Sequence, residues 1–114
     1  MPFDEFLAER VQRVLAENKT SYELKKMMGG LIFMVNDKMC VGVDKDRKTL
    51  EDRLMVRVGK LNYDDLLQEQ GCRVMDFTGK EMKGFIFVYA QGIDTEEQLS
   101  FWIERALAFN EQLA

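Results

Sequence analysis

Residues 27–43 read MMGGLIFMVNDKMCVGV, and this stretch is apolar almost from end to end. Only the tripeptide Asn36–Lys38 interrupts it. A strand with one face in water alternates apolar and polar residues, whereas a strand covered on both faces is apolar throughout. The stretch therefore predicts two strands, Leu31–Val35 and Met39–Val43, that need cover on both faces. They are joined at Asn36-Asp37, and these residue types tolerate the left-handed backbone of a tight hairpin turn.

Both faces of this hairpin carry apolar side chains, because alternate residues of a strand point to opposite faces. In the first strand, the odd-numbered residues of Leu31–Val35 share one face, and Ile32 and Met34 share the other. In the second strand we expect Met39, Val41 and Val43 to oppose Cys40 and Gly42.

The rest of the chain carries helix and strand patterns around the hairpin. Apolar residues at helical spacing predict helices at both ends, Asp4–Asn18 and Asp94–Gln112. Asp94 with Glu97 three residues later is expected to form a capping box. Further strands are expected at Tyr22–Met28, Arg53–Val58, Arg73–Phe77 and Gly84–Tyr89, with a short helix from Asn62 to Gln68. This order predicts a single α+β domain over residues 1–114, with a mostly antiparallel sheet and flanking N- and C-terminal helices.

The two long helices can cover one face of the sheet, so the other face needs a second cover. We expect that cover to be either the short helix with the segment Cys72–Met82, or a second copy of the chain. The second alternative makes the protein a homodimer with a self-complementary interface. Methionine adapts to irregular contacts and is frequent at binding surfaces. The candidate interaction face consists of Met28, Ile32, Met34 and Met55.

Composition indicates a soluble domain. The chain of 114 residues is 46% apolar and 32% charged, which is ordinary for a globular protein. No apolar run reaches the roughly 18 residues of a membrane span, and no secretory signal begins the chain, so we expect no membrane association and a cytoplasmic location. Cys40 and Cys72 are too few for a disulfide framework and are expected to be free.

Charge is unevenly distributed along the chain. The net charge is −4, which argues against general nucleic-acid binding. Residues 10–60 nevertheless carry twelve Lys and Arg against seven Asp and Glu, whereas residues 61–114 carry four against ten. Nucleic-acid contact through the basic half remains an alternative, and it would need Tyr63, Phe77 and Tyr89 as exposed stacking residues.

The residue types of common active sites are missing. The sequence has no histidine, which removes the most frequent general base and metal ligand. The loop Asp44–Thr49 begins like a calcium loop, but Lys48 and Thr49 occupy its third ligand position and its glycine position. We therefore expect no catalytic residues, no metal and no cofactor.

One charged set could bind an anion. Arg57, Asp76, Lys80 and Lys83 could meet at an edge of the sheet. A protein that binds a small anionic ligand, or an enzyme that uses Arg57, Asp76 and Lys83, is accordingly the alternative function.

Four stretches of the chain carry a family resemblance: Lys26–Met39 (KMMGGLIFMVNDKM), Leu54–Gly59 (LMVRVG), Met75–Phe85 (MDFTGKEMKGF) and Trp102–Leu107 (WIERAL). Together they resemble the N-terminal domain of the TfoX/Sxy family, bacterial proteins associated with regulation of natural competence. The departures are Met28, where the family usually has Phe, and Lys26, where Arg is common.

The resemblance implies an α+β fold similar to secretion-chaperone-like domains, among which dimers are common. It implies no catalytic residues and suggests a regulatory or interaction role. Competence regulators of this family carry a second, C-terminal domain, and we expect the present chain to be a stand-alone copy of the first. The expected function is therefore a non-enzymatic interaction or regulatory module, dimeric and with a possible protein partner.

Overall fold

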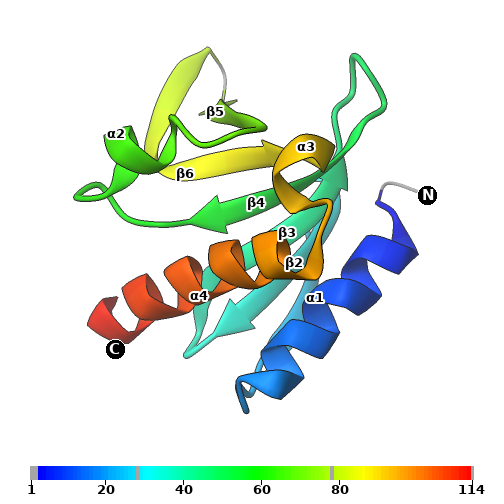
Figure 1. The fold of residues 1–114 in the computed structure, drawn as a ribbon, viewed down its shortest axis with the longest axis vertical. Helices are drawn as coiled ribbons and strands as arrows, with labels where there is room; N and C mark the ends of the chain where they lie inside the picture. The colour runs from blue at the N-terminus through cyan, green and yellow to red at the C-terminus, as the bar shows by residue number, and fades with distance from the viewer. Residues whose placement is uncertain (1–2, 28, 78, 114) are drawn as a thin grey trace.

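The structure is a computed structural model that describes residues 3–27, 29–77 and 79–113 (Figure 1). Its six strands form one sheet in the order β1-β2-β3-β4-β6-β5, and all neighbours are antiparallel. The α+β prediction is confirmed. The helices are α1 (Glu5–Glu17), α2 (Tyr63–Leu66), α3 (Ala90–Ile93) and α4 (Glu96–Leu113), and the strands are β1 (Glu23–Met27), β2 (Gly30–Val35), β3 (Lys38–Lys45), β4 (Asp52–Arg57), β5 (Cys72–Phe77) and β6 (Lys80–Tyr89).

The β2–β3 hairpin forms as expected around a two-residue turn. Asn36 and Asp37 have φ angles of 53° and 62°, the left-handed conformation that the turn requires. The expected alternation in β3 is wrong at Met39 and Cys40. Met39 pairs with Met34 and Val41 pairs with Phe33, so Cys40 is an extra residue in a β-bulge. The bulge sends Met39 to the face of Met34 and leaves Cys40 in the core with Val41.

Helices α1 and α4 cover one face of the sheet, as Figure 1 shows. This helix-covered face contains the odd-numbered residues of β2, as the sequence predicts. The fully buried side chains from α1 include Val11, Val14 and Leu15, and those from α4 include Leu99 and Ile103. The sheet contributes Leu31, Phe33, Val35, Val41, Val43, Leu54, Val56, Ile86 and Val88 to the same core.

The C-terminal helix begins differently from the prediction. The Thr95 hydroxyl accepts a hydrogen bond from the Gln98 N–H at 3.1 Å, and the Thr95 N–H donates to Gln98 Oε1 at 2.9 Å. The capping box is therefore Thr95 with Gln98, one residue later than the expected pair of Asp94 and Glu97. The residues before it form the separate short helix α3, whose last carbonyl, that of Ile93, accepts a 2.8 Å hydrogen bond from Arg10.

The second face of the sheet carries a methionine-rich cluster, which we call the methionine face. In β5 and β6, Val74 pairs with Ile86 and Asp76 pairs with Glu81, so Met75 alone lies opposite four residues of β6. This irregularity buries Met75 to 2% exposure against the cluster. The buried members are Ile32, Met55, Met75, Phe87 and Tyr89, with Met34, Met39, Met82 and Phe85 packed beside them.

The segment Cys72–Met82 was expected to fold over the sheet, but it forms β5 and the start of β6 within the sheet. It contributes Met75 and Met82 to the methionine face as residues of those strands. The short helix α2 does not contribute, because Tyr63 and Leu66 pack into the opposite, helix-covered core.

Both cysteines are free, as expected. Burial raises the pKa of the Cys40 thiol to about 12, which makes it an unreactive core residue. Among the described residues, no helix is long and apolar enough to cross a membrane.

Candidate binding groove

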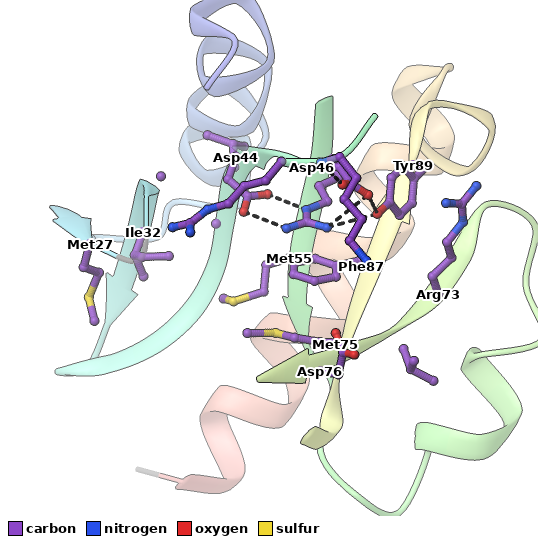
Figure 2. A pocket seen from close by; sticks show the side chains of 17 residues that line it. Met27, Ile32, Asp44, Asp46, Met55, Arg73, Met75, Asp76, Phe87 and Tyr89 are labelled. Atoms are coloured by element: carbon purple, nitrogen blue, oxygen red, sulfur yellow. Dashed lines mark hydrogen bonds and ion pairs between the residues drawn. The ribbon is translucent and has the colours of Figure 1, made fainter. Parts of the chain in front are cut away.

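A groove of about 560 Å³ lies on the methionine face. Its floor is formed by Ile32 and Gly42 from the central hairpin, Met55 from β4 and Phe87 from β6. Figure 2 shows Met27 and Ile32 on one side of Met55 and Phe87, and Arg73 on the other. The walls are the end of β1 at Met27, the loop residues 46–48, and residues 73–76 of β5.

The absence of a side chain at Gly42 gives the floor its shape. A side chain at this position would place its Cβ 2.7 Å from Ile32 Cδ1 and 3.6 Å from Met55 Cε. Because glycine leaves that space to its neighbours, Ile32 and Met55 close the floor above it.

Arg53 of β4 lies at one end of the groove in a network of hydrogen bonds. Its Nε and Nη2 donate to the two carboxylate oxygens of Asp44 at 2.8 and 3.1 Å, and its Nη1 donates to the Tyr89 hydroxyl at 3.0 Å. The guanidinium carbon lies 3.6 Å from the centre of the Phe87 ring, a cation–π contact. Burial disfavours its charge, but the hydrogen bonds with Asp44 and Tyr89 outweigh that effect and raise the pKa of Arg53.

Asp46 connects this network to the loop between β3 and β4. Its Oδ2 accepts a 2.7 Å hydrogen bond from the Tyr89 hydroxyl, and its Oδ1 accepts one from the Lys48 N–H at 2.8 Å. Chiefly because of the Tyr89 hydrogen bond, the pKa of Asp46 falls to about 2. The pKa of Tyr89 is raised, first by burial and then by the same hydrogen bond. At neutral pH the Asp46 carboxyl group is therefore ionised and the Tyr89 hydroxyl is neutral.

The loop is closed by its own backbone. The Asp46 N–H donates to the Glu51 carbonyl and the Leu50 N–H donates to the Asp46 carbonyl, both at 2.8 Å. At its base, Lys45 Nζ lies 2.7 Å from Asp52 Oδ1. The charged stretch that follows β3 is therefore a closed turn whose first side chain, Asp46, is tied to β6.

Three further cations line the groove. The Arg73 guanidinium lies 4.2 Å from the centre of the Tyr89 ring. Arg47 reaches the β1–β2 turn, where its Nη2 lies 3.6 Å from the position of a Cβ on Gly29. Lys48 lies beside Arg47 in the same wall. Within the described ranges, no carboxylate lies within 4.0 Å of the charged nitrogens of Arg47, Lys48 or Arg73.

Comparison with protein families identifies the domain. The family model described as the TfoX N-terminal domain matches residues 14–110, which include every residue that lines the groove. The chain belongs to the TfoX N-terminal domain family. The resemblance seen in the sequence is thereby confirmed.

A solved structure supports the fold of this TfoX N-terminal domain. The crystal structure of a protein from Pseudomonas syringae superposes with a TM-score of 0.60. The match covers 87% of this chain and 93% of the other, at 14% sequence identity, so it concerns the fold alone. No curated protein sequence matches the chain.

The residues expected to form an anion site in this TfoX N-terminal domain lie mostly outside the groove. Arg57 packs at the far end of β4, with its guanidinium 5.3 Å from the Phe85 ring centre and 5.7 Å from that of Phe109. Lys80 and Lys83 are exposed on β6 and do not line the groove. Of the four expected residues, only Asp76 lines it.

The expected interaction face is partly enclosed by the chain. Ile32 and Met55 are buried in the floor of the groove, at 4% and 3% exposure, and Met34 packs beside them. Met28 lies outside the described residues. The face is therefore a concave surface within one molecule, and two of its expected contact residues are its floor.

The aromatic set expected for nucleic-acid stacking is not exposed. Tyr63 and Tyr89 are buried, at 2% and 3% exposure, and the side chain of Phe77 lies outside the described residues. Burial removes two of the three faces on which bases could stack.

Sequence reasoning missed the groove residues Arg47, Arg73 and Tyr89. The excess of Lys and Arg in residues 10–60 pointed to the basic half that contains Arg47. Nothing local to Arg73 and Tyr89 indicated that they would meet, because their contact depends on the pairing of β5 with β6.

Proposed function

We propose that this domain is a non-enzymatic recognition module with a regulatory or interaction role, and that it binds its target in the groove on the methionine face. The supporting observation is a groove of about 560 Å³ whose floor is apolar. Ligand sites of folded proteins are mostly apolar concavities of roughly 300–1,000 Å³ with a few polar groups. The groove fits that description, and methionine gives the floor adaptability.

The ionisable groups at the groove favour binding over catalysis. A general base works best with a pKa near the operating pH. The pKa of Asp46 is instead lowered to about 2, and the pKa of Tyr89 is raised. Arg53, Asp44, Asp46 and Tyr89 engage one another rather than pointing an unpaired reactive group into the groove.

A neutral apolar dye tests this proposal. N-phenyl-1-naphthylamine fluoresces when it enters an apolar site, and we expect it to bind the wild-type domain saturably at one site. Met27 is 38% exposed at the mouth of the groove, so Met27→Trp should fill the mouth, preserve the fold and weaken binding at least about tenfold. Leu61→Trp adds the same ring at a position that is 91% exposed and outside the groove, and should leave binding unchanged. Equal binding by wild type and Met27→Trp would refute the proposal.

For the assembly, we propose a homodimer in which two β1 strands pair antiparallel. β1 is an edge of the sheet, all five of its residues are exposed, and Leu24 retains 46% exposure. A two-fold axis at Leu24 would bring the two Leu24 side chains together. The same register would place Glu23 of each copy opposite Lys25 of the other, so that two opposite-charge pairs flank the apolar contact. An unpaired edge with such self-complementarity favours a second copy as its partner.

Charge exchange tests this register. Glu23→Lys and Lys25→Glu should each place like charges opposite one another and shift sedimentation toward the monomer. The double variant, with both exchanges, should restore the dimer. Sedimentation velocity at several concentrations is the measurement. A monomeric wild type, or a dimer that neither single exchange weakens, would contradict pairing through β1.

A further inference from the structure

We infer that the groove binds an amphipathic anion, with an apolar body on the floor and its carboxylate, sulfonate or phosphate group against the cationic rim that Arg47, Lys48 and Arg73 form. This inference rests on the proposed function and names the chemical class of ligand that the groove would take. It follows from how the charges of the lining are divided between paired and unpaired groups.

Arg53 stacks on Phe87 of the floor, but its hydrogen-bonding capacity is largely taken. Three of its nitrogens donate to Asp44 and Tyr89, and Nη1 lies 3.6 Å from Asp46 Oδ2. Two carboxylates thus surround one guanidinium. Arg53 shapes this end of the groove and stacks on Phe87, while Asp44 and Asp46 offset its charge.

The remaining positive charge belongs to Arg47, Lys48 and Arg73. Arg73 lies over the Tyr89 ring, which holds the guanidinium plane at the wall and leaves its N–H groups available to a ligand. Arg47 and Lys48 extend from the loop that Asp46 fixes. Guanidinium groups bind carboxylates and phosphates through paired hydrogen bonds, so two arginines at one groove favour an anion there.

Asp76, the one other acidic residue among the described residues of the lining, lies apart from Asp46 (Figure 2). Asp76 follows Met75 on β5, and Figure 2 shows it beside Met75 and away from Asp46. Cations that no described carboxylate pairs therefore lie on two sides of the groove, Arg47 at the β1–β2 turn and Arg73 beside Tyr89, and the apolar floor lies between them. Charge complementarity at the rim and apolar contact along the floor together select an amphipathic anion.

Two dyes of nearly the same shape separate the anionic group from the apolar body. The probes are 8-anilinonaphthalene-1-sulfonate, which carries one sulfonate, and neutral N-phenyl-1-naphthylamine. In the double variant Arg47→Gln/Arg73→Gln, we expect the sulfonate dye to bind about 10- to 100-fold more weakly and the neutral dye to bind as before. Lys80→Gln/Lys83→Gln removes the same charge outside the groove and should leave both affinities unchanged. Both double variants must unfold as cooperatively as the wild type and give the same near-ultraviolet circular dichroism signal from Trp102. This control is needed because the sulfonate dye also binds partly unfolded proteins.

The wild-type domain provides a second measurement that needs no substitution. Added sodium chloride should weaken binding of the sulfonate dye and leave binding of the neutral dye unchanged. If the arginine and lysine double variants lose affinity for the sulfonate dye equally, only diffuse charge attracts the dye and the inference is overturned. An affinity that does not depend on salt would overturn it as well, because charge would then not contribute to binding. If the neutral dye still binds and is blocked by Met27→Trp, the proposed function stands while the anion preference fails. If neither dye binds the wild type, both are wrong.

Discussion

The phenolic hydroxyl of Tyr89 donates a 2.7 Å hydrogen bond to Asp46, a residue 43 positions away in the sequence. Tyr89 ends β6, and Asp46 begins the loop that follows β3. This contact joins the end of β6 to the loop wall of the groove and is the largest cause of the low pKa of Asp46. The pH dependence of the unfolding free energy should therefore report whether this hydrogen bond is present.

Removal of this hydrogen bond should change how stability depends on pH. Because the folded pKa of Asp46 is about 2 and the ordinary value is 3.8, its contribution is present above pH 3.8 and is lost as the pH falls through about 2. Tyr89→Phe should therefore lower the free energy of unfolding by about 1–3 kcal/mol at pH 7. The difference from wild type should shrink between pH 4 and pH 2. Urea denaturation at pH 7, 4 and 2 measures it.

Tyr22→Phe is the matched control for that experiment. Tyr22 packs its ring 5.6 Å from that of Phe33, centre to centre, and its hydroxyl makes no side-chain hydrogen bond among the described residues. This control should show no pH-dependent difference from wild type. A Tyr89→Phe deficit of constant size from pH 7 to pH 2 would mean that the hydrogen bond does not set the pKa of Asp46.

The two adjacent glycines of the β1–β2 turn should respond oppositely to asparagine. Gly29 has φ of +76°, which asparagine tolerates, and the nearest atom to a Cβ there is 3.6 Å away. A Cβ on Gly30 would collide with the backbone oxygen of Val43 and lie 2.7 Å from Asp44 Cβ. Gly30→Asn should cost about 1–3 kcal/mol of unfolding free energy, and Gly29→Asn less than about 1 kcal/mol. Thermal or urea denaturation showing the reverse order would contradict the close packing of β2 on β3.

The start of α4 provides a test of the capping box. Thr95→Ala removes the hydroxyl that accepts from the Gln98 N–H and should cost about 1 kcal/mol. Asp94→Ala is the control, and we expect a smaller cost because Asp94 is not the capping residue. Chemical denaturation of both variants decides between the two positions. A larger loss of unfolding free energy for Asp94→Ala would instead support the capping box of Asp94 with Glu97 that the sequence predicts.

Asn110 should be the most sensitive polar residue of α4. It is 3% exposed, donates to the Val35 carbonyl at 2.9 Å and accepts from Asn36 Nδ2 at 2.9 Å. Asn110→Ala leaves the buried carbonyl of Val35 without this partner and should cost about 1–3 kcal/mol. Gln112→Ala, at an exposed position of the same helix, should cost less than about 0.5 kcal/mol. Equal urea midpoints for the two variants would show that the helix-to-hairpin hydrogen bonds do not contribute.

Local chemistry explains which parts of the fold could be predicted. Asn36-Asp37 encodes its turn through residues that accept left-handed backbone, and the apolar parity of β2 follows from strand geometry alone. The bulge at Cys40 could not be predicted, because Cys is equally suited to either face and the pairing with β2 decides where it points. The predicted position of the capping box was wrong for a related reason. Asp94 with Glu97 and Thr95 with Gln98 both fit the pattern, and the turn of α3 selected the second.

The groove was harder to predict than the fold. The sequence marked Ile32, Met34 and Met55 as one apolar face, and the structure places Ile32 and Met55 in the floor. The charged residues around it come from a loop and from β5, more than twenty positions apart, and they meet because β5 lies beyond β6 in the sheet. Arg57 was expected at an anion site with Asp76 and the two lysines of β6, but it lies at the far end of β4 beside Phe109 and outside the groove.

Methyl NMR during titration with 8-anilinonaphthalene-1-sulfonate tests the central claim most directly. Met27, Met55 and Met75 line the groove, whereas Ile103 lies fully buried in the helix-covered core on the opposite face. The account predicts saturable shifts of the three methionine methyl groups with a common dissociation constant, while the Ile103 methyl groups stay unchanged. Shifts spread equally over both faces, or no shift of Met55 and Met75 at saturation, would contradict it.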